Sequence, residues 1–194
     1  MMAHRATVKA IKEVNPDIKV GLTLSLFDYQ AVPGGEEQAT KLWYEDFGCY
    51  LPYIKDDDFL GVQNYSRKLV NAKGAQPPAD GVSVTQMGYE DYPISIGNVL
   101  RKVLKEYPGE MVVTENGIAT ADDARRCEFL KEAVASVKAA KADGGNVTGY
   151  MCWSLQDNFE WQAGSAKTFG LITVDRKTQN RTPKESLHVL GGLN

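Results

Sequence analysis

Four short segments of this chain are rich in apolar and β-branched residues, and longer segments with helical periodicity separate them. The short segments are residues 18–25, 58–65, 111–116 and 147–154. Segments of this kind are typical of strands that are buried on both faces of a parallel sheet. The helical segments are residues 3–14, 36–54, 93–107, 122–142 and 183–190. This alternation predicts an α/β fold with one parallel sheet and right-handed crossovers.

The length and composition fit a single domain that covers residues 1–194 and can bury a core of its own. The net charge of −3 argues against nucleic acid as a partner. No window approaches the roughly 18 apolar residues of a membrane span, so we expect no membrane association. The first residues lack the apolar core of a signal peptide, which favours a cytoplasmic location.

The cysteines and histidines of the chain do not form recognisable clusters. Cys49, Cys127 and Cys152 are odd in number and scattered, so we expect free thiols rather than a disulfide framework. His4 and His188 are the only imidazoles, and no Cys/His spacing suggests a metal site. We therefore expect neither a metal nor a cofactor.

Two motifs end the third and fourth predicted strands. The first is VVTENGIA at residues 112–119, and the second is WSLQDNFEW at residues 153–161. In parallel α/β barrels the active site lies where the C-terminal ends of the strands meet the following loops. Glu115 and Trp153 occupy such positions, and Tyr65 occupies the same position at the end of the second predicted strand.

Together the two motifs resemble family 1 of the retaining glycoside hydrolases, the β-glucosidase family, and the resemblance covers essentially the entire chain. It implies a partial (β/α)8 TIM barrel, in which the four parallel strands correspond to strands five to eight with their helices. A complete barrel has eight strands and typically about 250 residues. The implied activity is hydrolysis of terminal β-linked sugars, from β-glucosides or related β-glycosides, by double displacement.

The resemblance implies that Glu115 is the catalytic nucleophile and that Tyr65 donates a hydrogen bond to it. Retaining glycosidases use two carboxyl groups about 5–5.5 Å apart, one to attack the anomeric carbon and one to protonate the leaving oxygen. The family carries the acid/base glutamate in an Asn-Glu-Pro motif at the end of strand four, and this tripeptide is absent here. An isolated strand-end glutamate is more often a solvated side chain, but the whole surrounding motif favours the catalytic interpretation.

The substrate-binding residues implied by the resemblance are Trp153, Glu160, Trp161, Phe169, Gln63 and Asn116. A sugar has apolar faces and a rim of hydroxyls, so it suits an aromatic platform, here Trp153, beside fixed polar groups such as Glu160. Phe169 is expected either to line the sugar pocket or to pack in the core. Gln63 stands where the family commonly has Asn, which would change the contacts on the leaving-group side.

Because the half that carries the acid/base group is absent, we expect activity to depend on assembly. A lone four-stranded sheet would expose two edges and an apolar inner face. We therefore expect a homo-oligomer, or pairing with a complementing N-terminal half-barrel. Two alternatives stay open: a weak or inactive remnant that binds sugar or serves as a self-assembling structural unit, and an unrelated α/β protein of the doubly wound kind.

Overall fold

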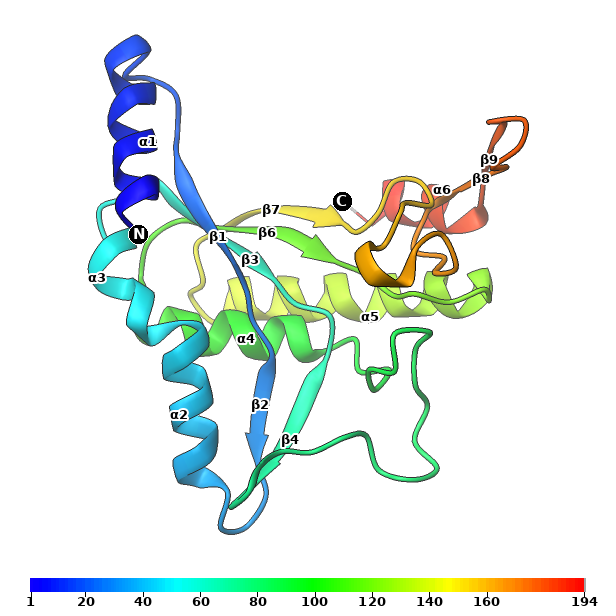
Figure 1. Cartoon of the computed structure of the whole chain (residues 1–194), viewed down its shortest axis with the longest axis horizontal. Coiled ribbons are helices and arrows are strands. Elements are labelled where there is room, and N and C mark those ends of the chain that lie inside the picture. Colours follow the sequence, from blue (N-terminus) through cyan, green and yellow to red (C-terminus); the bar gives the residue numbers. More distant parts are fainter. Residues whose placement is uncertain (194) are drawn as a thin grey trace.

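The computed structural model describes residues 1–193 and contains a sheet of four parallel strands (Figure 1). The strands, in spatial order, are β1 (Gly21–Ser25), β3 (Phe59–Gln63), β6 (Met111–Asn116) and β7 (Val147–Cys152). Each strand is parallel to its neighbours, and the spatial order follows the order along the chain. The parallel α/β architecture expected from the sequence is therefore confirmed, with strands shorter than expected by up to three residues at an end.

The helices are α1 (Met2–Val14), α2 (Glu36–Asp46), α3 (Leu51–Ile54), α4 (Ser95–Leu104), α5 (Asp123–Ala142) and α6 (Glu185–Gly191). The single helix expected over residues 36–54 is interrupted. Phe47 leaves the helical conformation with φ −132° and ψ −60°, and a short 3-10 turn, Gly48–Tyr50, follows. Pro52 then lies in the first turn of α3, where its missing N–H group has no helical partner to lose.

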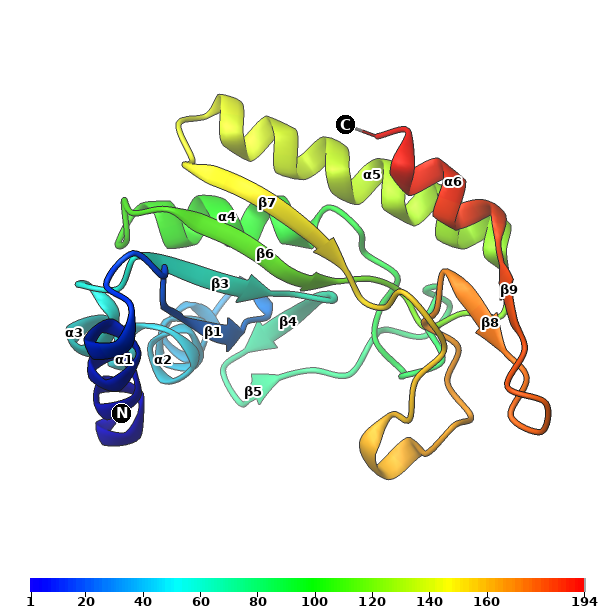
Figure 2. The same ribbon diagram turned by 90° about the horizontal axis from the view of Figure 1, so that it is seen from above.

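The hydrophobic core lies between one face of the sheet and helices α4 and α5, which run along it (Figure 2). Leu60 and Val62 of β3 and Met111 and Val113 of β6 are fully buried there. In β6 the buried residues alternate with a less buried one, which is the two-residue period of a strand, whereas Gly61 between Leu60 and Val62 in β3 is buried as well. The carboxylate of Asp122 caps α5 by accepting hydrogen bonds from the first backbone N–H groups of the helix, in agreement with its acidic start.

Two small sheets were not expected from the sequence. One consists of β2 (Asp28–Ala31), β4 (Arg67–Asn71) and β5 (Gly74–Ala75), and the other is the hairpin of β8 (Ile172–Val174) and β9 (Arg181–Pro183). β2 follows β1 and β4 follows β3, so the parallel pair β2–β4 continues the pairing of the main sheet beyond its C-terminal edge. These strands are short and mainly polar, and they lack the apolar pattern that identified the main strands.

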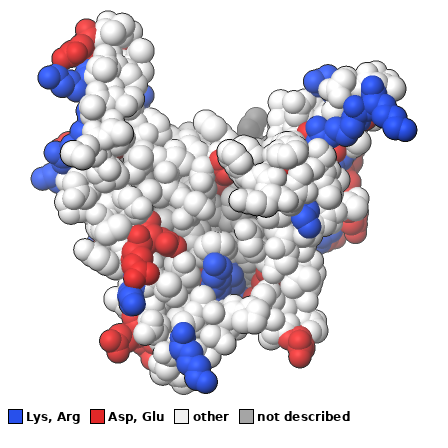
Figure 3. Space-filling view, viewed as in Figure 1, with Lys and Arg blue, Asp and Glu red and all other residues white. Residues whose placement is uncertain are grey.

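The other face of the main sheet is open between the projecting helix α1 and the hairpin β8–β9. Among the described residues, β1 and β7 have a neighbour on one side only, so both sheet edges are free. Thr23 and Ser25 are exposed on this face, and Met151 is 56% exposed. Figure 3 shows a mostly uncharged hollow between the two projections. The face is thus mixed rather than uniformly apolar, because small and hydroxyl side chains occupy the middle of β1.

No helix among the described residues is both long and apolar enough to cross a membrane.

The ends of β6 and β7 approach so closely that one position tolerates only glycine. The backbone N–H of Trp153 donates to the carbonyl of Asn116 at 2.8 Å, and a Cβ on Gly117 would lie 1.9 Å from the Trp153 carbonyl oxygen. We predict that Gly117→Ala destabilises the fold by about 1–3 kcal/mol through overpacking, measured by urea unfolding. Gly192→Ala is the control, since its nearest neighbour would be 3.6 Å away. Equal unfolding midpoints for the two variants would contradict the close approach.

Candidate active site

Glu115 lies at the C-terminal end of β6, and each oxygen of its carboxylate accepts one hydrogen bond. The amide Nε2 of Gln63 donates to Oε1 at 2.7 Å, and the hydroxyl of Tyr65 donates to Oε2 at 2.5 Å. Both donors come from the end of β3 and the loop after it. The register between β3 and β6 shifts at Gln63, which aligns Gln63 directly with Glu115. Two donors from a neighbouring strand therefore orient the carboxylate toward the open face.

Tyr65 is held as a hydrogen-bond donor by its surroundings. Burial, together with the hydrogen bond to Glu115 and its negative charge, raises the pKa of Tyr65 far above its ordinary value. The ring of Phe169 packs edge-on against the Tyr65 ring, with centroids 6.0 Å apart and an interplanar angle of 71°. The hydroxyl is therefore fixed in place by a carboxylate on one side and an aromatic ring on the other.

A network of buried amides connects the ends of the four main strands. Asn64 donates from its side chain to the carbonyls of Leu26 and Ser66, both at 2.9 Å. Asn116 donates to the carbonyl of Asn64 at 2.7 Å and accepts from the hydroxyl of Tyr150 at 2.7 Å. Because these groups are buried, each bond supplies a partner that water cannot provide.

Asn116 was expected to contact substrate, and its position argues otherwise. The side chain is completely buried, and its amide nitrogen and oxygen are both used within the strand-end network. It is not among the residues that line the cavity beside Glu115. Asn116 therefore links the strand ends, and a contact between its side chain and substrate stays a prediction.

A cavity of about 260 Å³ opens beside Glu115 at the C-terminal edge of the sheet. The expected site residues that line it are Gln63, Tyr65, Glu115, Trp153, Glu160, Trp161 and Phe169. Ser25, Met87 and Tyr89 also line it and were not expected from the sequence. Ser25 ends the first strand, so the strand-end rule could have identified it. Met87 and Tyr89 lie in the long connection of residues 66–91, where no periodicity or motif marks them.

The loop after β7 presents the remaining polar and aromatic groups. Trp153 and Ser154 are joined by a cis peptide bond. Glu160 accepts a hydrogen bond from the Asn158 amide at 2.8 Å, and the side chain of Trp161 is 79% exposed. A half-buried carboxylate in a cavity that two indole rings also line offers a hydrogen-bond acceptor beside apolar surface, which is the combination that a sugar requires.

A buried arginine fastens the segment that carries Phe169 to the loop after β6. The Arg126 guanidinium is 1% exposed and donates to the backbone carbonyls of Thr120 and Thr168, at 2.5 and 2.8 Å. Asp157 accepts from the backbone N–H of Gly170 at 2.9 Å, and a Cβ on Gly170 would lie 2.2 Å from the Asp157 nitrogen. The wall of the cavity is therefore held by backbone contacts as well as by packing.

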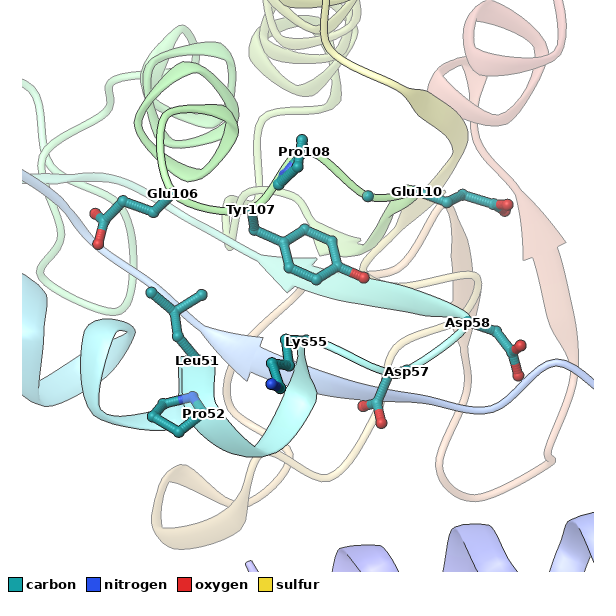
Figure 4. Close-up of a pocket in the computed structure, with 10 residues that line it drawn as sticks. Leu51, Pro52, Lys55, Asp57, Asp58, Glu106, Tyr107, Pro108 and Glu110 are labelled. Carbon is teal, nitrogen blue, oxygen red and sulfur yellow. The ribbon is translucent and has the colours of Figure 1, made fainter.

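Another cavity, of about 510 Å³, lies at the opposite, N-terminal end of the strands (Figure 4). Three of its carboxylates are paired with basic side chains: Asp57 with His4, Asp58 with Lys12 and Glu110 with Lys19, at 2.8, 2.7 and 2.6 Å. The fourth, that of Glu106, accepts a hydrogen bond from the indole nitrogen of Trp43 at 2.7 Å. In barrels of this kind the N-terminal end serves stability and the C-terminal end serves catalysis. Within the described part of the chain, no group of three or more His, Cys, Asp or Glu side chains could hold a metal ion.

Comparison with known proteins agrees with this geometry. Residues 53–193 match the model of glycosyl hydrolase family 1. β-Glucosidase A of Thermotoga maritima is 37% identical, over 96% of this chain and 52% of that protein. The 6-phospho-β-galactosidase of Lacticaseibacillus casei is 33% identical, over 66% of this chain and 35% of that protein. The crystal structure of β-glycosidase BGL167 superposes with a TM-score of 0.92 at 45% identity, covering 97% of this chain and 45% of that one.

The chain thus spans about half the length of such relatives, as the count of four strands implies. The partial (β/α)8 barrel inferred from the resemblance is confirmed by the superposition on β-glycosidase BGL167. The match to the family model covers most of the chain and includes both motifs of the candidate site. The chain therefore belongs to glycosyl hydrolase family 1.

Proposed function

We propose that this chain carries the nucleophile half of a retaining β-glycosidase active site, with β-glucosides or related β-glycosides as substrates. The observation that carries the proposal is the double hydrogen bond to Glu115, from Gln63 and Tyr65, in a cavity with aromatic walls. β-Glucosidase A, the relative at 37% identity, supplies the expected substrate class.

In the proposed mechanism Glu115 attacks the anomeric carbon and forms a glycosyl ester as the bond to the leaving oxygen breaks. An acid protonates the leaving oxygen, and water later hydrolyses the ester and frees Glu115. The Gln63 amide and the Tyr65 hydroxyl hold the carboxylate in its attacking orientation, so that little reorganisation is needed in the transition state.

The sugar that is transferred would lie against the aromatic residues of the second motif. Trp153 supplies a platform for the apolar face of the ring, and Phe169 closes the side next to Tyr65. Glu160 accepts hydrogen bonds from the outer hydroxyls, with Trp161 donating from its indole nitrogen. The high exposure of Trp161 leaves that nitrogen accessible to a ligand.

The acid/base group would come from the remaining half of the barrel, whether on a longer polypeptide or on a second one. The free edges of β1 and β7 are the places where such a half would pair. A second copy of this chain could pair there too, but it would bring no Asn-Glu-Pro motif. Without the acid, the rate falls by roughly 10²–10⁴-fold.

A sugar-binding remnant without turnover is the second candidate function, favoured by the absence of the Asn-Glu-Pro motif from this sequence.

The charges of the cavity favour a sugar without phosphate. Glu115 and Glu160 line it, and no lysine, arginine or histidine does so among the described residues. The nearby ammonium of Lys167 donates to the backbone carbonyl of Gln86. A 6-phosphate would therefore meet two carboxylates and no free cation, unlike the substrates that the name of the Lacticaseibacillus casei relative implies.

All three cysteines are free thiols in the structure. Free thiols suit a reducing compartment, so we also propose a cytoplasmic location.

Complementation tests the nucleophile assignment. Mixed with the N-terminal half-barrel of Thermotoga maritima β-glucosidase A, the chain is expected to hydrolyse an aryl β-glucoside. Glu115→Gln is expected to lower that rate by at least about 10³-fold, because the attacking oxygen is removed. Glu110→Gln is the matched control, since Glu110 directly precedes the same strand at its other end and pairs with Lys19. Equal rates for Glu115→Gln and the parent chain would refute the assignment.

Tyrosine titration tests the donor role of Tyr65. Its raised pKa means that the hydroxyl keeps its proton in alkaline solution, so Tyr65→Phe should leave the rise in tyrosinate absorbance up to pH 11 unchanged. The measurement is ultraviolet difference absorbance on the folded chain. A smaller rise in the variant than in the parent would show that Tyr65 ionises with the ordinary tyrosines.

Substrate charge provides a third test. In the complemented enzyme, an aryl β-glucoside is expected to react at least about tenfold faster than its 6-phosphate, because of the two carboxylates in the cavity. The comparison uses kcat/KM at fixed ionic strength. Preference for the phosphorylated substrate would contradict the proposed sugar class.

A further inference from the structure

A second cavity, of about 240 Å³, adjoins the candidate active site. It lies between β4 and the loop of residues 76–90, and its walls include Phe27, Lys68, Pro77, Pro78 and Tyr89. Tyr89 also lines the cavity of Glu115, so the two cavities share one wall. We propose that this second cavity binds an aromatic carboxylate, as the leaving-group part of a glycoside whose sugar lies beside Glu115.

Lys68 supplies the charge that selects an anion. Its ammonium lies 3.7 Å from the centroid of the Phe27 ring, and it forms no hydrogen bond or ion pair with any described residue. Burial lowers the pKa of Lys68 from its ordinary value, while the negative charge of Asp46 acts in the opposite direction without a direct contact. A ligand carboxylate beside this ammonium would supply the direct hydrogen-bonded partner that Asp46 does not provide.

The other charges of the cavity are balanced. Arg67 donates to both oxygens of Glu90, at 3.0 and 2.7 Å, and its guanidinium stacks over the Tyr92 ring. Arg67 and Glu90 therefore offset each other, and Lys68 leaves the lining with a net positive charge. This charge differs in sign from that of the cavity beside Glu115, where the charged groups are the carboxylates of Glu115 and Glu160.

The remaining walls suit a flat ring. Phe27 and Tyr89 pack edge to face with centroids 5.7 Å apart, and Pro77 and Pro78 form an apolar side. The volume is below the roughly 300 Å³ at which pockets for drug-sized ligands begin, so it fits one aromatic ring with its carboxylate. An acidic sugar would satisfy Lys68 but would place its hydroxyl rim against these apolar walls.

This inference rests on the proposed function for the position of the sugar, and it adds the class of the leaving group. In the reaction a Glu115 oxygen forms a bond to the anomeric carbon as the bond between that carbon and the phenolic oxygen breaks. The hydroxybenzoate leaves as the phenolate, which takes its proton from the general acid of the completed barrel or from water. A phenolic oxygen also departs with less help from a general acid than an alcohol does.

Equilibrium binding of 4-hydroxybenzoate to the whole chain, measured by titration calorimetry, tests the inference without requiring turnover. Binding is expected to weaken about tenfold in Lys68→Met, which keeps the apolar stem of the side chain but removes the charge. The methyl ester of 4-hydroxybenzoate should bind about tenfold more weakly than the acid in the parent chain, and Lys68→Met should not weaken it further. Lys73→Met is the matched control, because Lys73 is exposed in the turn between β4 and β5 and lies outside the cavity.

Absence of binding, or equal binding of the acid by the parent chain and Lys68→Met, would overturn the inference. Equal affinities for the acid and its ester would do the same. A Glu115→Gln variant that binds 4-hydroxybenzoate normally supports the cavity even if glycoside turnover is never found, so failure of the proposed function is distinguishable from failure of this inference.

Discussion

Two buried asparagines, Asn64 and Asn116, hold together the part of the molecule on which the candidate site depends. Through their hydrogen bonds the segment after β1, the ends of β3 and β6, and Tyr150 of β7 are joined below the cavity floor. A buried amide that loses its partner costs about 1–3 kcal/mol, so the strand ends cannot shift independently. Gln63, Tyr65 and Glu115 are adjacent in the chain to these asparagines, so the network also limits their movement. The two donors therefore stay within hydrogen-bonding distance of the Glu115 carboxylate, although one face of the sheet is open.

The sequence predicted the parts of the fold that follow from apolar periodicity and from strand ends. The main strands and the long helix α5 are strongly patterned, and Glu115 and Tyr65 lie at strand ends beside recognisable motifs. β2 and β4 could not be found in this way, because they are short and have no clear apolar pattern. They are stabilised by pairing with each other, although they lie far apart in the sequence. The place of Asn116 in the buried network was not expected, because a motif does not reveal whether a side chain lines a cavity or takes part in buried hydrogen bonds. Tyr89 lies in an irregular connection, where only three-dimensional packing brings it beside Glu115.

The candidate site lies at the edge of the open face of the sheet. Glu115, its two donors and the aromatic wall belong to this chain, and the sequence contains no Asn-Glu-Pro tripeptide. Under the proposed function the acid/base group would lie on the remaining half of the barrel, which would pair at the free edges of β1 and β7. The open face carries the exposed hydroxyl groups of Thr23 and Ser25, which water can solvate. It also exposes the apolar side chain of Met151, which burial against another surface would stabilise.

The most direct test of the central claim is to trap Glu115 itself. The folded chain, alone and with the N-terminal half-barrel of Thermotoga maritima β-glucosidase A, would be incubated with a 2-deoxy-2-fluoro-glucoside that has a dinitrophenyl leaving group. Intact-mass spectrometry followed by peptide mapping would locate any covalent sugar. A glycosyl adduct is expected on Glu115 in the completed barrel, and none in Glu115→Gln. An adduct on another carboxylate, or none from the completed barrel, would contradict it.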